Sequence, residues 1–140
     1  MSSDLAVIIV NWNVSALLKR CLESLEKSRD ISFTSSPARY RGDVTVVDNA
    51  SSDDSVEMVR TLFPWVHLIA SDVNLGFSRA NNLVMKSRIM EDPPSFFLLL
   101  NPDTEVSPDA LCLMLDYMVA NPEVGVLGPC LLYTSDAADE

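Results

Sequence analysis

Positive charge, glycine and long apolar runs are all in short supply, and each shortage excludes a class of protein. The 140 residues carry ten Lys and Arg against twenty Asp and Glu, for a formal net charge of −10. A nucleic-acid-binding surface needs clustered positive charge, so we expect no nucleic acid partner. The apolar run Leu5–Val10 is far shorter than the ~20 residues of a membrane-spanning helix. We therefore expect no transmembrane segment in this chain.

Cysteine is also scarce. Cys21, Cys112 and Cys130 are odd in number, scattered and without CxxC spacing, which indicates neither a disulfide framework nor a zinc site. No charged N-terminal region followed by a long apolar stretch marks a signal peptide. We expect a reducing, cytoplasmic location, and we leave peripheral contact with a membrane open.

Only four glycines occur, and none of them forms a Gly-rich phosphate loop. A dinucleotide-binding oxidoreductase would carry GxGxxG after its first strand, and a nucleotidylyltransferase would need a Gly-rich loop there. The segment after the first apolar run, Asn11–Val14, contains no glycine. A phospho-acceptor regulatory domain would need an acidic pair at the same place, where this chain has Asn11 and Asn13. The residues argue against all three classes without excluding the last.

Apolar runs alternate along the chain with segments whose apolar residues have helical spacing. The predicted strands are Leu5–Val10, Val44–Val47, Val66–Ala70, Phe96–Leu100 and Val124–Leu127, and the predicted helices are Ser15–Arg29, Ser55–Phe63, Ser78–Met90 and Pro108–Ala120. This alternation predicts an α/β fold in which helices flank a mostly parallel sheet. Ile31–Gly42 is predicted to be a surface excursion. With 48% hydrophobic residues, the chain can bury the core of a single domain.

Two predicted strands run directly into acidic turns. Phe96–Leu100 is followed by Asn101-Pro102-Asp103-Thr104, and Val44–Val47 is followed by Asp48-Asn49-Ala50-Ser51. Ligands of open α/β sheets bind just beyond the carboxyl ends of the strands. The two acidic turns therefore predict one shared site.

Four sequence blocks stand in the order and rough spacing of the family 2 glycosyltransferases. They are VIIVNWN at 7–13, VVDNASSD at 46–53, NLGFSRANN at 74–82 and LLLNPDT at 98–104. Over residues 5–129 the chain resembles this family, and in particular its rhamnosyltransferase-like branch. The resemblance implies a Rossmann-like GT-A fold, a nucleotide diphosphate sugar as donor, a divalent metal (Mg²⁺ or Mn²⁺) and inversion at the anomeric carbon. It also implies a role in polysaccharide or cell-wall biosynthesis, with dTDP-rhamnose as the donor suggested by the branch.

The resemblance makes Asp103 the candidate metal ligand, since Mg²⁺ and Mn²⁺ prefer oxygen ligands. Asn101 stands where the first acid of the family's DxD pattern usually lies. An amide oxygen is a weaker ligand, so we expect Asn101 to meet water, ribose or the sugar. The alternative for Asn101-Pro102-Asp103 is a turn whose side chains bond nearby backbone.

The same resemblance makes Asn11 and Asp48 candidates for contact with the base or ribose of the nucleotide. The alternative for Asp48 is a turn-closing or capping role. Asn74 and Arg79 flank the start of a predicted helix, where an anion is favoured, and Arg79 is the candidate for contact with the diphosphate. Its alternative is a solvated surface arginine. Trp12 could stack on a ligand, although an aromatic residue near a strand end is more often part of the core.

The catalytic base is not identified. Inverting transfer needs an acid residue that accepts the proton of the acceptor hydroxyl, and in the family it lies well beyond the metal motif. Glu105 and Asp109 are better explained as loop and first-turn residues. We therefore expect a truncated fragment: residues 1–129 as the donor-binding part, and 130–140 as a tail that resembles a translated sequencing adapter, with a natural acidic tail as the alternative. The acceptor, a hydroxyl of a glycan or a lipid-linked molecule, is unknown. A non-catalytic nucleotide-sugar-binding module and a nucleotidylyltransferase-like domain are the alternative functions.

Overall fold

Strands and helices alternate along residues 2–130, the part of the chain that a computed structural model describes. The strands are β1 (Leu5–Asn11), β2 (Ile31–Ser32), β3 (Tyr40–Asn49), β4 (His67–Ser71) and β5 (Phe96–Leu100). The helices are α1 (Ser15–Glu26), α2 (Ser55–Leu62), α3 (Phe77–Glu91) and α4 (Ala110–Ala120). The predicted α/β fold is confirmed, and eight of the nine predicted elements are present with ends within four residues of the prediction.

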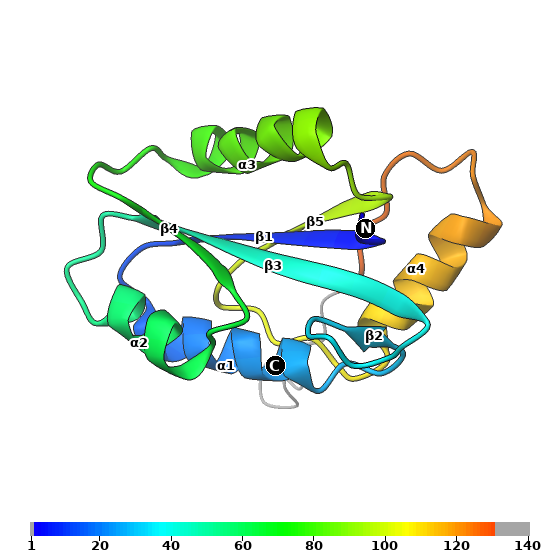
Figure 1. Cartoon of the computed structure of the whole chain (residues 1–140), viewed down its shortest axis with the longest axis horizontal. Helices are drawn as coiled ribbons and strands as arrows, with labels where there is room; N and C mark the ends of the chain where they lie inside the picture. The colour runs from blue at the N-terminus through cyan, green and yellow to red at the C-terminus, as the bar shows by residue number, and fades with distance from the viewer. Residues whose placement is uncertain (1, 131–140) are drawn as a thin grey trace, which may run out of the picture.

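The sheet is parallel in every pair of strands that the structure describes. β1 lies between β3 and β5, and both β2 and β4 pair with β3. Asn11, the last residue of β1, lies opposite Asp48 of β3. The carboxyl ends of β1, β3, β4 and β5 therefore meet along one edge of the sheet (Figure 1). This edge carries the loops that hold the predicted site residues.

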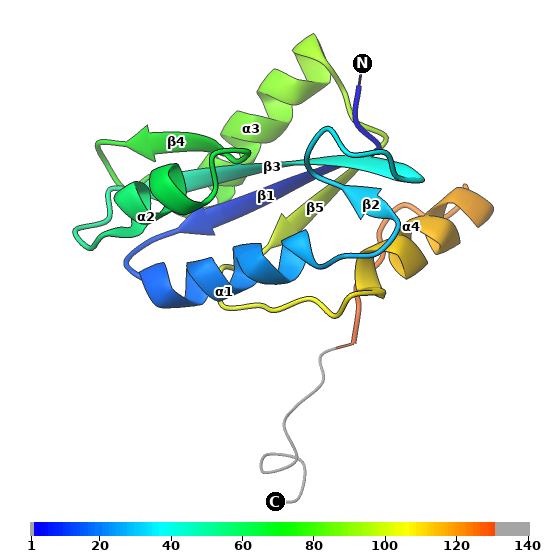
Figure 2. The same cartoon turned by 60° about the horizontal axis from the view of Figure 1, so that its bottom comes forward.

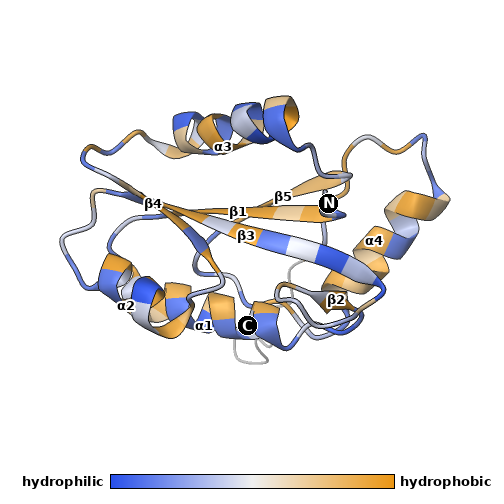
Figure 3. Cartoon of the chain, in the orientation of Figure 1, coloured by the Kyte–Doolittle hydropathy of each residue, from blue (hydrophilic) through white to orange (hydrophobic). Residues whose placement is uncertain are grey.

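Helices cover both faces of the sheet, because the side chains of β1 alternate between them. Leu5, Val7 and Ile9 pack in one core cluster with residues of α1, α2 and α4. Ile8 packs on the other face against Ala80 and Val84 of α3. Figures 1 and 2 show α3 alone on its side of the sheet. Figure 3 shows that β1 is apolar along most of its length, whereas β3 begins with polar residues.

The predicted strand Val124–Leu127 is wrong, because these residues form no strand in the structure. The N–H of Val124 instead closes a turn by donating to the carbonyl of Asn121 at 3.0 Å, and Val126 is 89% exposed. A short apolar run becomes a strand only where a neighbouring strand satisfies its backbone groups, and no strand among residues 2–130 pairs with this one.

The predicted excursion 31–42 is wrong in part. It contains β2 and the first residues of β3, and Tyr40 donates its backbone N–H to the carbonyl of Asp30 at 2.9 Å. The Phe33 ring lies across Gly42, where an added Cβ would approach Phe33 Cε1 to 2.5 Å. Gly42 is thus required by close packing, and it lets the excursion fold back on the sheet.

Of the predicted tail 130–140, all but Cys130 lies outside the described residues. Within residues 2–130 no helix is long and apolar enough to span a membrane.

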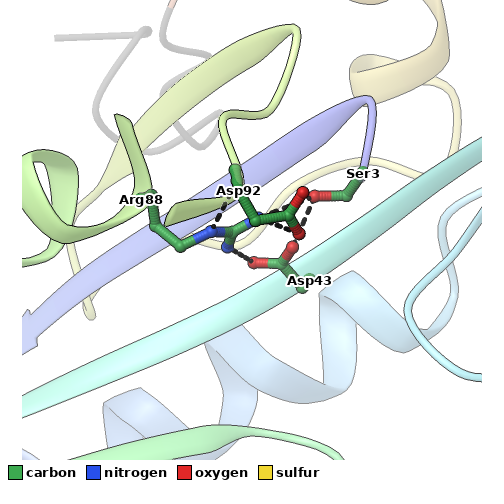
Figure 4. Close-up of polar contacts among 4 residues, drawn as sticks. All are labelled: Ser3, Asp43, Arg88 and Asp92. Atoms are coloured by element: carbon green, nitrogen blue, oxygen red, sulfur yellow. Dashed lines mark hydrogen bonds and ion pairs between the residues drawn. The ribbon is translucent and has the colours of Figure 1, made fainter. Parts of the chain in front are cut away.

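An ion-pair cluster joins the far end of α3 to the sheet (Figure 4). Arg88 of α3 donates to Asp43 of β3 at 2.6 Å and to the hydroxyl of Ser3 at 3.1 Å. Ser3 in turn donates to Asp43 at 2.5 Å. The side chains of Arg88 and Asp43 are only 18% and 24% exposed, so water screens this pair far less than a surface pair.

We expect Arg88→Met to lower the free energy of unfolding by roughly 1–3 kcal/mol, because Asp43 would stay partly buried without its cation. Urea denaturation measures this change. The matched control is Arg20→Met, since the Arg20–Glu105 pair is 62% and 58% exposed and should be worth less than about 0.5 kcal/mol. Equal effects of the two substitutions would contradict the structural role of Arg88.

Candidate functional site

The site residues that the sequence predicts lie at the carboxyl ends of strands, in the loops that follow them or in the first turn of α3. Asn11 ends β1, and Asp48 lies one residue before the end of β3. Asn74 and Arg79 lie on either side of the start of α3, and Asn101 and Asp103 follow β5. The predicted residues thus gather along one edge, but they differ in whether they reach solvent.

Asn11 and Asp48 form a buried hydrogen-bonded group. Asn11 is 0% exposed and Asp48 is 2% exposed. Asn11 Nδ2 donates to Asp48 Oδ1 at 3.0 Å, and the Ser51 hydroxyl donates to the same oxygen at 2.7 Å. The backbone N–H of Ser51 donates to Asp48 Oδ2 at 2.9 Å. The structure therefore gives Asp48 its alternative, turn-closing role, and contact of these two buried side chains with a ligand stays a prediction.

A second group of hydrogen bonds ties the loop after β1 to the loop after β3. Asn13, at φ 54°, accepts at its side-chain oxygen from the backbone N–H of Ser52 at 2.7 Å. The side chain of Asp53 accepts from the first backbone N–H of α1, that of Ser15, at 3.1 Å and from the first backbone N–H of α2, that of Ser55, at 3.0 Å. Partial desolvation would raise the pKa of Asp53, but bonds from the Ser55 hydroxyl and these N–H groups lower the pKa below its usual value. The two loops form one unit.

Asn49 is a residue of this edge that the sequence analysis did not single out. Its side chain is on the α3 face of the sheet and is 3% exposed. Asn49 Oδ1 accepts from the N–H of Leu75, and Asn49 Nδ2 donates to the carbonyl of Gly76, both at 3.2 Å. The feature of the sequence that could have identified Asn49 is the polar residue at the end of an apolar strand. An Asn next to an Asp is also typical of turns, so nothing in the sequence was a reason to choose it.

Arg79 and Asn74 flank the positive-φ residue Gly76. The side chain of Asn74 accepts from the N–H of Gly76 at 2.8 Å, and Gly76 has φ 78°. Arg79, in the first turn of α3, is exposed and has no hydrogen bond or ion pair to any residue among 2–130. An unpaired guanidinium beside a helix N-terminus is suited to an anion.

Asn101 and Asp103 are both exposed in a turn that Thr104 closes by donating its N–H to the carbonyl of Asn101 at 3.1 Å. The Cys21 thiol lies beneath this turn, with its Sγ 3.8 Å from the carbonyl oxygen of Asn101. Burial, followed by the negative charges of Asp103 and Glu105, raises the pKa of Cys21 to about 12. Of these two carboxylates Glu105 is paired with Arg20 at 3.6 Å, so Asp103 is the one without an ion pair among residues 2–130.

Asp103 is compatible with a divalent metal but does not form a complete metal site. In the described part of the chain no group of three or more His, Cys, Asp or Glu side chains could hold a metal. Mg²⁺ is often bound by only one or two carboxylates, together with waters and substrate phosphates. Asp103, which has no hydrogen bond within residues 2–130, fits that kind of ligand set.

Two buried acceptors and one exposed ring complete this edge. The side-chain oxygens of Asn11 and Asn81 are buried and have no hydrogen-bond partner among the described residues. The sequence left two roles open for Trp12, stacking on a ligand and the more common position in the core. The core position is wrong, because Trp12 is 56% exposed and lies in the loop beyond the end of β1; stacking on a ligand stays a prediction.

Two cavities of the described chain lie away from this edge. One, of about 370 Å³, is lined by β2, the residues after it and Trp65. The other, of about 640 Å³, runs between β5, α4 and residues 125–129. Neither of these two cavities is lined by Asn11, Asp48, Arg79 or Asp103.

The model of glycosyl transferase family 2 matches residues 6–139 of the chain. A curated relative, N-acetylglucosaminyl-diphospho-decaprenol L-rhamnosyltransferase of Mycobacterium tuberculosis (strain CDC 1551 / Oshkosh), is 26% identical over 138 residues. The alignment covers 94% of this chain and 42% of the relative. The chain therefore spans less than half the length of the curated relative.

Solved structures of S. aureus TarS share the fold. The structure of TarS 1-349 has a TM-score of 0.69 at 20% identity, and covers 85% of this chain and 33% of that one. Its complex with UDP-GlcNAc has a TM-score of 0.67 at 21% identity, with 85% of this chain and 32% of that one covered. The predicted GT-A fold is confirmed by these likenesses.

We expect Asp48→Ala to lower the free energy of unfolding by roughly 1–3 kcal/mol, because it orphans the N–H of Ser51 and the side-chain amide of Asn11. Chemical denaturation followed by circular dichroism measures the loss. Asp103→Ala is the control, since the exposed Asp103 has no partner to lose and its removal should change stability by less than about 0.5 kcal/mol. An Asp48→Ala variant as stable as the parent would show that the buried group is not needed for folding.

Proposed function

The chain belongs to glycosyl transferase family 2, and from that membership we propose that it binds the nucleoside diphosphate part of a sugar donor at the carboxyl edge of its sheet. The observation that carries the proposal is that this edge holds a cation, Arg79 in the first turn of α3, and a carboxylate, Asp103 in the loop after β5. Neither side chain has a hydrogen bond or an ion pair to another residue among 2–130. A diphosphate needs positive charge from the protein, and a metal that neutralises it needs oxygen ligands.

Each exposed residue has a separate role in the proposal. Arg79 and the first N–H groups of α3 bind the diphosphate oxygens. Asp103 holds a divalent metal, which would supply stabilisation of the negative charge on the departing diphosphate. Asn101 and Asn74 face the sugar or ribose, because both side chains are exposed and carry amide donors and acceptors.

Asn11 and Asp48, whose side chains are buried, are proposed to contact the base or ribose of the nucleotide. The side-chain oxygen of Asn11 is an acceptor with no partner among residues 2–130, and an imide N–H of thymine or uracil is a donor that could pair with it. Because Asn11 is 0% exposed, this contact requires the loop that contains Trp12 to move. Trp12 itself is exposed and could then stack on the base.

The reaction is proposed to be an inverting, metal-assisted transfer of a sugar to a hydroxyl. The activity named for the M. tuberculosis relative supports rhamnose as the sugar and a lipid-linked diphospho-sugar as the acceptor. We propose dTDP as the carrier of the sugar, as the sequence resemblance implies. Neither Glu105 nor Asp109 is assigned as the general base. Glu105 pairs with Arg20 at 3.6 Å and Asp109 with Arg29 at 3.0 Å, which supports a loop-tethering role for both.

We expect the chain to bind dTDP or UDP more tightly in the presence of Mg²⁺ or Mn²⁺, and we expect Asp103→Ala to remove this dependence. Isothermal titration calorimetry with metal and with chelator measures it. Glu105→Ala is the control, because it removes a charge from the same loop without removing the proposed ligand. Equal binding by the parent chain with metal and with chelator would overturn the metal assignment.

We expect the parent chain to bind dTDP more tightly than dTMP, and Arg79→Met to weaken dTDP binding about tenfold while leaving dTMP binding almost unchanged. The reason is that a charge-assisted bond to the second phosphate is lost. Lys86→Met is the control, since Lys86 is an exposed cation further along the same helix. A loss of the same size in Lys86→Met would indicate a general charge effect and contradict a specific contact.

A further inference from the structure

The carbonyl of Gly76 is shared between the sheet and the start of α3. It accepts from Asn49 Nδ2 at 3.2 Å and from the N–H of Ala80 at 3.4 Å, which is the first backbone bond of the helix. The N–H of Leu75, one residue earlier, donates to Asn49 Oδ1 at 3.2 Å. A single buried amide on β3 therefore holds two backbone groups of the turn from which α3 begins, the N–H of Leu75 and the carbonyl of Gly76.

α3 is fixed to β3 at both of its ends. Asn49 holds the turn before the helix, and at the other end Asp43 binds Arg88 at 2.6 Å (Figure 4). Between these points Ala80 and Val84 pack on the sheet, and such apolar contacts are not directional. The two polar anchors therefore decide where the first turn of α3 lies along the sheet and how it is rotated.

We propose that Asn49 is a positioning residue for Arg79, which sets the location of the guanidinium relative to the loops after β1 and β5. Arg79 lies in the helical turn that begins at Gly76, whose carbonyl accepts from Asn49. The Arg79 side chain has no hydrogen bond or ion pair among residues 2–130, so its position depends on where the backbone of this turn lies. The inference rests on the proposed contact of Arg79 with the diphosphate. It assigns to Asn49 an effect on diphosphate binding without any contact to the ligand.

Gly76 shows why the turn needs such an anchor. Its φ of 78° lies in the left-handed region, so the chain reverses sharply just before α3. Asn74 bonds the N–H of Gly76 at 2.8 Å from within the loop, but a bond inside the loop cannot fix the loop to the sheet. Among the described residues, only Asn49 joins this turn to β3 through side-chain hydrogen bonds.

The test is a double-mutant cycle between Asn49→Ala and Arg79→Met, read as the affinities for dTDP and dTMP. We expect Asn49→Ala to weaken dTDP binding about tenfold, since two buried hydrogen bonds that hold the turn are lost, and to change dTMP binding by less than about twofold. In the Arg79→Met background, Asn49→Ala should have no further effect on dTDP affinity, because the residue it positions is gone. The control is Asn121→Ala, which removes an amide that donates to Tyr117 at the end of α4.

The outcomes separate the two proposals. The positioning role is overturned if the losses of dTDP affinity in Asn49→Ala and Arg79→Met add in the double variant. It is also overturned if Asn49→Ala weakens dTDP and dTMP binding equally. In both cases the diphosphate contact of Arg79 stands. A parent chain that binds dTDP no better than dTMP would overturn the diphosphate contact and this inference with it. If Asn49→Ala does not fold, Gly76→Ala tests the same turn. The Cβ that alanine adds at position 76 would meet no atom within 4 Å, but the φ of 78° at this position disfavours alanine. Any loss of dTDP affinity caused by Gly76→Ala must also vanish in the Arg79→Met background.

Discussion

The hydrogen-bonded group of Asn11, Asp48 and Ser51 is the interaction on which the rest of this edge depends. β1 and β3 lie side by side in parallel, so the chain leaves both at the same edge and must turn there into two different helices. A carboxylate that is 2% exposed is costly unless its oxygens are bonded, and here one oxygen accepts from Asn11 and Ser51 and the other from the backbone of Ser51. Ala50, between them, has φ 62°, a conformation that this group of bonds maintains.

A rigid lower layer and an exposed upper layer follow from this arrangement. Asn11, Asp48 and Asn49 are buried and hydrogen-bonded, whereas Asn74, Arg79, Asn101 and Asp103 are exposed. The exposed residues come from two segments that are far apart in the sequence, the start of α3 with the loop before it and the loop after β5. The exposed layer can therefore change its side chains without rebuilding the layer beneath, because the backbone is held independently of it.

The sequence predicted the architecture better than the roles of individual residues. Continuous apolar strands and amphipathic helices are local signals, so the alternation and the parallel sheet could be predicted. The partners of Asn11 and Asp48 could not, because they depend on the register that puts these two residues opposite each other. Val124–Leu127 has strand composition but no pairing partner among the described residues, and composition alone does not supply one. For Trp12 the core was the more common of two expectations, because the sequence does not show whether a neighbouring element covers the ring.

The adjacent residues Asp48 and Asn49 lie on opposite faces of the sheet, which makes β3 intolerant of slippage. A slip of β3 by one position in one direction would put Asn49 where the carboxylate of Asp48 now accepts three bonds. A slip in the other direction would put Asp48 opposite the carbonyl of Gly76, to which a carboxylate cannot donate. Misalignment of this strand would thus be penalised by mismatched donors and acceptors as well as by exposure of its apolar side chains. An insertion or deletion of one residue in β3 should be harmful for the same reason, even where it leaves the composition of the strand unchanged.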